Sequence, residues 1–257
     1  MTEGELDWPA YLAEFHRTRT GVTEAVLSRA TAGENTPYRW LARAVSADAT
    51  TVVDLASGSG PMSRMLARPG RTVVGVDLSP AELELAAERG PGPWVQGDAL
   101  ALPFRDGSVD VVTSSLGLVV VTPLSHVLEE VVRVLRPGGV LAAIAPAVRP
   151  LEARDLRVLG RIAARLRAKP QFPGPVEVAG FHKGLEAAGL TRVEDRRERY
   201  SFPVRSREDA ELVISALYLP GTRQSRVEAA VEYLEDRLEQ HKPVEVAIPM
   251  RRIVAIK

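Results

Sequence analysis

The alternation of strand-like and helix-like segments constrains the fold of this chain more than any other feature of its sequence. Short apolar runs rich in β-branched residues alternate with helical segments of about 10–15 residues, a spacing typical of strands and crossover helices. The expected strands lie at residues 51–57, 71–79, 94–96, 109–115 and 140–145. We therefore expect an α/β fold, with a parallel sheet covered by helices on both faces.

The segments on either side of this region are mainly helical. Apolar residues recur at three- and four-residue spacing from Trp8 to Phe15, and further helical segments are expected as far as Val45. Beyond Pro150 we expect helices at residues 152–168, 176–188, 207–219 and 223–241, a strand at 192–202, and a closing strand or strand pair at 244–257. Because no linker is visible, residues 1–257 are expected to form a single domain.

Charge and cysteine content exclude several classes of protein. The 33 basic and 33 acidic residues cancel, so no net charge attracts the chain to nucleic acid or to an anionic membrane. The absence of cysteine excludes disulfides, thiolate metal sites and a cysteine nucleophile. The four histidines are scattered along the chain, so no metal site is expected.

Neither a membrane span nor a secretory signal is predicted. The apolar stretches at 116–121 and 140–145 are far shorter than the ~20 residues of a spanning helix. The first residues, MTEGELDWP, are acidic and contain no apolar signal segment. We expect a cytoplasmic location, and the strong preference for arginine over lysine indicates a GC-rich bacterial genome.

A glycine turn and an acidic residue follow the first two expected strands. The run DLASGSG at residues 54–60 leads from a strand into a helix, and glycines there let backbone N–H groups approach a ligand. Asp77 ends the next strand, where a carboxylate can accept both hydroxyls of a ribose. Taken alone, the turn could simply connect strand and helix, and Asp77 could cap a helix. Their spacing favours nucleotide binding.

Three more motifs follow in order. Gly-Asp-Ala at residues 97–99 ends the third strand, where an acid can accept a hydrogen bond from an adenine amino group, although Gly-Asp is also common in turns. The run LPFRDGSVDVV at 102–112 leads to Ser114 and Ser115. The run RVLRPGG at 133–139 is expected to be architectural, because nothing in it must touch a ligand.

These five motifs stand in the order seen in class I S-adenosylmethionine-dependent methyltransferases. The chain most resembles the small-molecule methyltransferases of ubiquinone and menaquinone biosynthesis, over roughly residues 50–145. The resemblance implies a Rossmann-like, mainly parallel seven-stranded sheet, with residues 49–147 as the cofactor-binding core. It also implies a helical N-terminal lid at 1–48, and a helical insertion at about 205–242 within the C-terminal half, 148–257.

The resemblance implies that S-adenosylmethionine binds to these motifs and leaves as S-adenosylhomocysteine. By position, the glycine turn holds the methionine moiety, Asp77 the ribose and Asp98 the adenine, with Leu78 beneath the adenine ring. The expected cofactor-binding residues are Asp54, Ala56, Ser57, Gly58, Gly60, Asp77, Leu78, Gly97, Asp98, Ala99, Ser114 and Ser115. Ala56 stands where the family usually has glycine, so we expect its φ to be negative.

No residue is an evident catalytic base. Methyl transfer is an in-line displacement that mainly requires alignment in a water-poor pocket. His16, at the edge of the apolar stripe from Tyr11 to Phe15, is the candidate base, and a structural histidine is the alternative. His126 is expected at the surface or at a helix cap.

Several other side chains have two interpretations. Four tyrosines could line an acceptor pocket or belong to the core: Tyr11, Tyr38, Tyr200 and Tyr218. The arginine-rich segments 192–199 and 251–252 are interpreted as solvated faces, because they interleave with acids or lie on strands.

We therefore expect a methyltransferase that acts on a small-molecule acceptor, as a monomer or homodimer, without nucleic acid as a partner. Residues 113–118 lack the Asn/Asp-Pro-Pro-Tyr/Phe sequence that methylates planar nitrogens, which disfavours DNA-adenine and protein-glutamine acceptors. Two alternatives stay open. The chain could bind S-adenosylmethionine without transferring methyl, or it could be an NAD-dependent oxidoreductase, although no third glycine follows Gly60.

Overall fold

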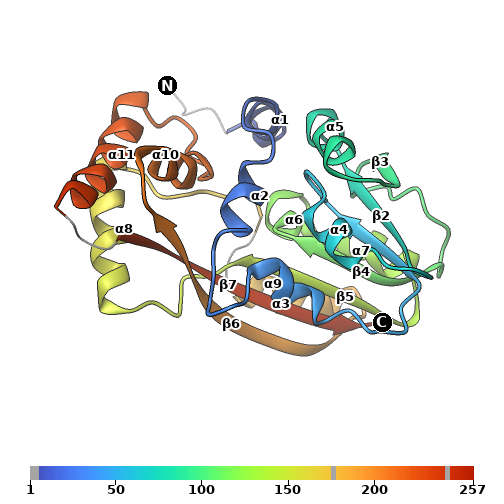
Figure 1. Ribbon diagram of the computed structural model, residues 1–257. Helices are drawn as coiled ribbons and strands as arrows, with labels where there is room; N and C mark the ends of the chain where they lie inside the picture. The colour runs from blue at the N-terminus through green and yellow to red at the C-terminus, as the bar shows by residue number, and fades with distance from the viewer. Residues whose placement is uncertain (1–5, 175–177, 241–243) are drawn as a thin grey trace, which may run out of the picture.

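A seven-stranded sheet organises the protein. The computed structural model describes residues 6–174, 178–240 and 244–257. Within these ranges the strand order is β3-β2-β1-β4-β5-β7-β6 (Figure 1). The strands are β1 (Thr51–Leu55), β2 (Thr72–Asp77), β3 (Trp94–Gln96), β4 (Val109–Ser115), β5 (Leu135–Pro146), β6 (Thr191–Val204) and β7 (Val244–Ile256). Strands β1 to β5 pair in parallel, and β7 is antiparallel to both of its neighbours, which confirms the mainly parallel sheet.

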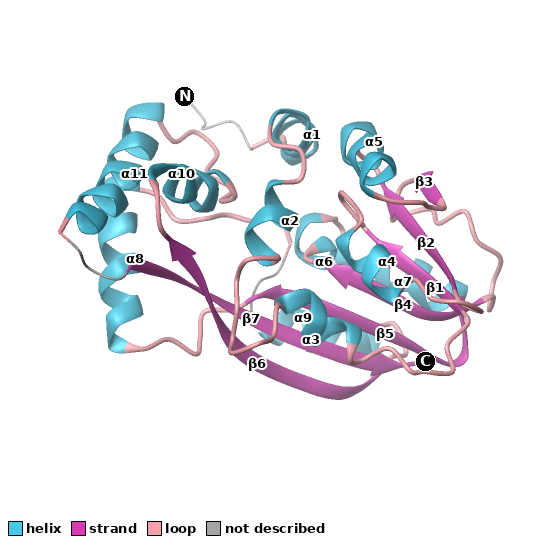
Figure 2. Ribbon diagram, viewed as in Figure 1, coloured by secondary structure: helices cyan, strands magenta, loops and turns pink. Residues whose placement is uncertain are grey.

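Helices precede, separate and follow the strands (Figure 2). The N-terminal ones are α1 (Trp8–Thr18), α2 (Val22–Leu27) and α3 (Pro37–Ala42). Those between the parallel strands are α4 (Pro61–Leu66), α5 (Pro80–Arg89), α6 (Gly117–Val120) and α7 (Leu124–Val134). The C-terminal half contains α8 (Ala153–Leu166), α9 (Val178–Ala187), α10 (Arg207–Ser215) and α11 (Gln224–Glu239). The predicted helix starting at Val176 and the end of the predicted insertion at 241–242, including His241, lie partly outside the described residues.

The alternation of side chains along a strand places helices on both faces of the sheet. Val53 and Leu55 of β1 join an apolar cluster that includes Leu128 of α7. Val52, which precedes Val53, joins a different cluster that includes Met62 of α4. Successive strand residues point to opposite faces, so the two clusters form the two halves of the core. The predicted arrangement, with helices on both faces, is confirmed.

Strands β6 and β7 extend beyond the rest of the sheet and carry a helical layer of their own. Their distal ends contribute Phe202 and Val246 to a third apolar cluster. That cluster also contains Ile162 of α8, Val213 of α10 and Leu234 of α11. Figure 1 shows these three helices together at the left of the molecule, opposite α5 and β3. The predicted helical insertion before the last strand is thus present.

The interpretation of residues 251–252 as a solvated face is wrong. Arg251 and Arg252 are only 1% and 7% exposed. Arg251 donates two hydrogen bonds of 2.7 Å to Asp195, and Arg252 donates bonds of 2.6 and 3.0 Å to Glu194. Both carboxylates come from the neighbouring strand β6, and this pairing compensates the burial of the guanidinium groups. The sequence alone favours a solvated interpretation of these arginines because it does not show which acidic residues the neighbouring strand places beside them.

One boundary differs from the expected one, and one open alternative is decided. The RVLRPGG run does not end before the strand, because β5 already begins at Leu135. The closing segment forms one continuous strand, β7, because all of it pairs with β6 or β5. Among the described residues, no helix is long and apolar enough to cross a membrane.

Candidate cofactor site

The carboxyl ends of four neighbouring strands bring the predicted cofactor residues to one edge of the sheet. Leu55 of β1 is in register with Val76 of β2 and with Ser114 of β4. Asp77, at the end of β2, is in register with Gln96 of β3. The glycine turn and the residues at 97–99 therefore lie on either side of Asp77. Ligands of open α/β sheets bind at this edge.

The turn after β1 is built from three residues with positive φ. Ala56 and Gly58 have φ of +53°, and Gly60 has φ of +79°. The expectation of a negative φ at Ala56 is therefore wrong. The turn is held by hydrogen bonds from Ser57 N to Val76 O and from Gly60 N to Ser57 O, both 3.0 Å. These bonds impose a left-handed conformation that costs a non-glycine residue about 1–2 kcal/mol.

Asp77 links the turn to the second strand. One carboxylate oxygen accepts from Gly58 N at 2.7 Å, and the other accepts from Ser79 N at 2.9 Å. Burial raises the pKa of Asp77, and these two N–H groups act in the opposite direction. An ionised carboxylate has about four lone-pair sites, so acceptor capacity remains for ribose hydroxyls. The next residue, Leu78, is 67% exposed, an unusual position for a large apolar side chain.

Asp54 lies beneath the turn. It is 1% exposed, and its two oxygens accept from Ser63 Oγ at 2.8 Å and from Thr113 Oγ1 at 3.0 Å. Burial raises the pKa of Asp54 to about 6, although both hydroxyl bonds lower it. Because both oxygens bond to protein hydroxyls, this carboxylate ties the turn to α4 and β4.

Three predicted serines have unused hydrogen-bonding capacity. The hydroxyls of Ser57, Ser114 and Ser115 are buried and have no hydrogen-bond partner within the described part of the chain. Asp98 is exposed, and its Oδ1 accepts from Leu100 N at 2.9 Å. Buried hydroxyls are normally satisfied, so three free ones around a glycine turn fit a polar ligand. The residues at this edge therefore fit S-adenosylmethionine.

A buried glutamate that was not predicted connects the N-terminal helices to this edge. Glu82, on α5, is 3% exposed and accepts 3.2 Å bonds from Gly21 N on both oxygens. The same carboxylate lies 3.0 Å from Nδ1 of His16 on α1. A side chain added at Gly58 would lie 3.7 Å from Glu82, so this contact adjoins the glycine turn. In the sequence, Ser79-x-x-Glu82 looks like a helix capping box, which concealed the role.

A second glutamate reinforces the connection from α2. Glu24 accepts from Ser59 Oγ at 2.7 Å, from Arg64 at 2.6 Å and from Arg89 at 2.6 Å. Arg64 also donates to Ser59 O at 2.5 Å. Residues 16–24 are therefore fastened over the outer side of the glycine turn. No local signal predicts this, because the partners are far apart in sequence.

His16 lies at the edge of the cofactor site with both ring nitrogens engaged. Since a carboxylate only accepts, Nδ1 donates to Glu82, and Nε2 lies 3.2 Å from the hydroxyl of Tyr218. Burial raises the pKa of Tyr218, which keeps its phenol protonated. Tyr11 and Phe15 of α1 pack their rings against Tyr218.

The other two described histidines and the other two candidate tyrosines lie elsewhere. His126 is exposed on α7, and His182 lies 3.3 Å from Glu186 on α9. Tyr38 and Tyr200 are buried in the cluster that contains Met62. Of the four predicted tyrosines, Tyr11 and Tyr218 are the two in the aromatic cluster beside His16.

Comparison with known proteins agrees with this geometry. A family model described as a methyltransferase domain matches residues 53–143. A demethylmenaquinone methyltransferase from Parafrankia sp. (strain EAN1pec) is 34% identical over 216 residues, which cover 68% of this chain and 83% of that protein. A demethylmenaquinone methyltransferase from Beutenbergia cavernae is 47% identical over 89 residues, or 34% of this chain and 37% of that protein. Several other curated relatives are also matched over only 19% to 53% of their length.

Solved structures share the fold. An S-adenosylmethionine-dependent methyltransferase from Thermotoga maritima superposes with a TM-score of 0.55 at 16% identity, covering 95% of this chain and 99% of that one. The cyclase SpnF superposes with a TM-score of 0.61 at 18% identity, covering 96% of this chain and 94% of that one. Fold and site together define a Rossmann-like protein that binds an adenosyl cofactor. The chain belongs to the class I S-adenosylmethionine-dependent methyltransferases, whose cofactor is S-adenosylmethionine.

Proposed function

We propose that this protein transfers a methyl group from S-adenosylmethionine to a small-molecule acceptor. The observation that carries the proposal is the position of Asp77, between the glycine turn and the exposed Leu78. A ribose bound by Asp77 would direct the adenine toward Leu78 and Asp98, and the methionine moiety toward the glycine turn. The bound sulfonium supplies a methyl group that is already activated for displacement.

The protein's own contribution is alignment and exclusion of water. Asp77 orients the ribose, and the free hydroxyls of Ser57, Ser114 and Ser115 are available for the polar groups of the cofactor. The segment fastened by Glu24 and Glu82 covers the turn and keeps water from its outer side. Holding two reactants in line in a dry site accelerates such a displacement without a new covalent intermediate.

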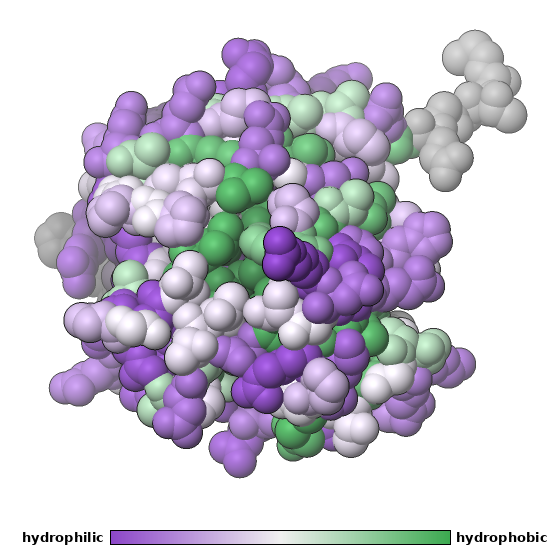
Figure 3. Space-filling view, turned by 90° about the vertical axis from the view of Figure 1, so that its right-hand side faces the viewer, coloured by the Kyte–Doolittle hydropathy of each residue, from purple (hydrophilic) through white to green (hydrophobic). Residues whose placement is uncertain are grey.

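The surroundings of His16 support a planar, apolar acceptor. The rings of Phe15 and Phe172 lie edge-on to Tyr218, with centroids 4.5 and 5.6 Å away. On the face of the molecule that lies at the right of Figure 1, apolar side chains gather at the centre and polar ones border them (Figure 3). Aromatic rings pack favourably against planar ligands. Together with the names of the relatives, this leads us to propose a demethylmenaquinone-type quinol as the acceptor.

His16 is the proposed general base for such an acceptor. In the neutral imidazole that donates from Nδ1 to Glu82, Nε2 carries no proton, so it can accept a hydroxyl proton once Tyr218 moves away. The alternative is that His16 only connects α1 to α5. In that case the methyl acceptor would be activated without the protein's help, or no transfer would occur.

The release of S-adenosylhomocysteine tests the proposal. The purified protein is incubated with S-adenosylmethionine and, separately, demethylmenaquinol, histamine or sarcosine. We expect release only with the quinol. Cofactor binding without release from any acceptor would favour a protein that binds S-adenosylmethionine without methyl transfer. The single-domain organisation, the oligomeric state and the cytoplasmic location stay predictions.

A further inference from the structure

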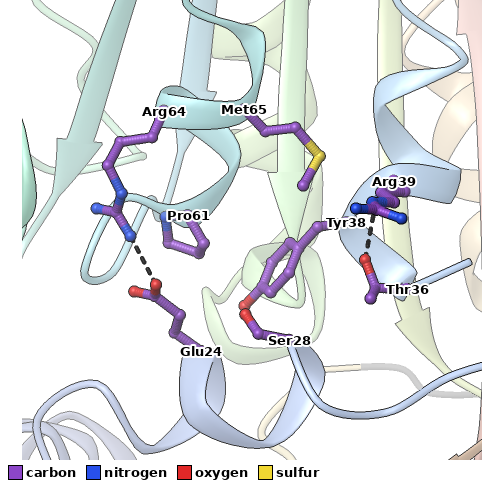
Figure 4. Close-up of a pocket in the computed structure, with 8 residues that line it drawn as sticks. All are labelled: Glu24, Ser28, Thr36, Tyr38, Arg39, Pro61, Arg64 and Met65. Carbon is purple, nitrogen blue, oxygen red and sulfur yellow. Dashed lines mark hydrogen bonds and ion pairs between the residues drawn. The ribbon is translucent and has the colours of Figure 1, made fainter.

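A pocket of about 420 Å³ lies among α2, α3 and α4, and we call it the α2–α3–α4 pocket (Figure 4). Its lining residues are Glu24, Ser28, Thr36, Tyr38, Arg39, Pro61, Arg64 and Met65. On α4, the residues that face the core are Met62, Ser63 and Leu66. The pocket residues of α4 lie on its other side, so the pocket faces away from the sheet.

Tyr38 places a hydroxyl donor in this pocket. The residue is only 2% exposed and lines the pocket, and its hydroxyl is not one of the buried polar atoms that lack a partner in the described part of the chain. The hydroxyl therefore reaches the open space of the pocket. Figure 4 shows its ring reaching into the centre of the lining residues, toward Ser28. Burial raises the pKa of Tyr38 well above its usual value, and the charge of Glu24 adds to the effect, so the phenol keeps its proton. A phenol O–H that opens into a pocket can donate a hydrogen bond to an acceptor bound there.

The remaining lining groups also offer donors. Arg39 donates from one guanidinium nitrogen to Glu34 O at 3.0 Å, and this exposed group forms no other side-chain hydrogen bond within the described ranges. Thr36 Oγ1 accepts from Arg39 N at 3.2 Å, which leaves the hydroxyl hydrogen available. The carboxylate of Glu24 is already occupied by Ser59 and two arginines. The lining is thus rich in donors and poor in free acceptors.

The net charge of the pocket lining also favours an anionic ligand. The lining contains two arginines, Arg39 and Arg64, and one carboxylate, Glu24, so its net charge is positive. Met65, which is 41% exposed, and Pro61 provide an apolar wall. A guanidinium and a phenol together suit a carboxylate, and the apolar wall suits a small hydrocarbon body attached to it.

We propose that the α2–α3–α4 pocket is a second ligand site, which binds a small organic carboxylate. Its carboxylate accepts hydrogen bonds from Tyr38 and Arg39, and its apolar body lies against Met65 and Pro61. The site adjoins the cofactor turn from outside, since Glu24 and Arg64 both bind Ser59. It does not depend on methyl transfer, and it remains accessible when the cofactor site is filled.

Methionine-methyl NMR with benzoate as the probe tests this proposal. The chain has four methionines, so ¹³C-methyl labelling yields few signals, and a Met65→Leu variant assigns the pocket signal. Met250, buried at 1% exposure in the core, is the internal reference. We expect benzoate to shift the Met65 signal saturably and to leave the Met250 signal in place, in the presence of saturating S-adenosylhomocysteine as in its absence.

Matched variants and a neutral probe identify the binding groups. Tyr38→Phe keeps the ring and removes the hydroxyl, and we expect it to weaken benzoate binding by about tenfold or more. Arg39→Gln is expected to weaken it similarly, whereas Arg43→Gln, an exposed arginine on the same helix end and outside the pocket, leaves it unchanged. Benzyl alcohol, which lacks the charge, is expected to bind at least about tenfold more weakly.

Three results would overturn the proposal. A Met65 shift that grows without saturation would mean that no site exists. Equal binding of benzoate and benzyl alcohol, or unchanged binding in Tyr38→Phe and Arg39→Gln, would mean that the carboxylate is not recognised. Displacement of benzoate by S-adenosylhomocysteine would place the probe in the cofactor site instead.

Discussion

Replacing Asp77 by asparagine tests the cofactor geometry most selectively. One carboxylate oxygen accepts a hydrogen bond from Gly58 N at 2.7 Å, and the other accepts one from Ser79 N at 2.9 Å. Asparagine has the same shape but only one acceptor oxygen, so its NH₂ group must face one of these N–H donors. The substitution therefore removes the negative charge and leaves a backbone donor without a partner.

Two separate free-energy changes follow. An unsatisfied N–H group costs about 1–3 kcal/mol of folding stability. The loss of charge-assisted hydrogen bonds to the ribose hydroxyls weakens cofactor binding by ~2 kcal/mol, which corresponds to about a 30-fold higher Kd.

Calorimetric titration with S-adenosylhomocysteine measures the second effect, and thermal unfolding measures the first. Asp48→Asn is the matched control, because Asp48 is exposed and lies outside the strand ends. We expect Asp48→Asn to bind like the parent protein. If Asp77→Asn also keeps the parent Kd within about twofold while folded, Asp77 does not hold the ribose and the reasoning is refuted.

Three further substitutions test other parts of the account. Burial raises the pKa of Asp54 from 3.8 to about 6, so its contribution to stability is present below the lower value and is lost as the pH rises through the upper one. Urea unfolding of the parent protein should show that the free energy of unfolding falls by about 3 kcal/mol as the pH rises through this range, and Asp54→Asn should abolish the decrease. Equal pH profiles for the parent protein and the variant would contradict the burial argument. Ala56→Gly removes the strain of a Cβ at positive φ, so we expect it to stabilise the protein by ~1 kcal/mol and to raise the thermal midpoint by about 2–4 °C. A lower midpoint would mean that the turn holds alanine without strain. His16→Asn is expected to reduce turnover with the quinol about 100-fold or more while S-adenosylhomocysteine affinity stays the same, whereas His126→Asn changes neither; unaltered turnover would assign His16 to structure.

The strand ends could be predicted from the sequence because their chemistry is local. A glycine turn after one buried strand and an acid after the next must meet when the strands are parallel neighbours. The observed bond between Gly58 N and Asp77 is the physical form of that rule. The apolar runs were equally informative, because a strand covered on both faces has few polar residues.

The contacts of the N-terminal segment could not be predicted in the same way. Glu82 and His16 are 66 positions apart, and nothing in either local pattern indicates the other. The burial of Arg251 depends in turn on Asp195, across a strand pair whose register only the fold defines. Long-range pairs of this kind are decided by tertiary structure, so single-sequence patterns favour a solvated interpretation.

Ala56 illustrates a third kind of difference. Intrinsic preference predicts a negative φ for alanine, but the turn's hydrogen bonds hold it at +53°. Gly117 makes room for it, since a side chain there would approach the Ala56 Cβ to 2.7 Å. Strained backbone of this kind persists where the surrounding structure determines it, and it occurs often at functional sites.

Parallel calorimetric titrations with S-adenosylmethionine, S-adenosylhomocysteine and NAD test the central claim most directly. The claim is that Asp77 and the glycine turn form an adenosyl-methionine site. It predicts that both S-adenosyl ligands bind with micromolar Kd, which is a binding free energy of ~8 kcal/mol, and that titration with NAD releases no heat of binding. Binding of NAD without binding of either S-adenosyl ligand would contradict it.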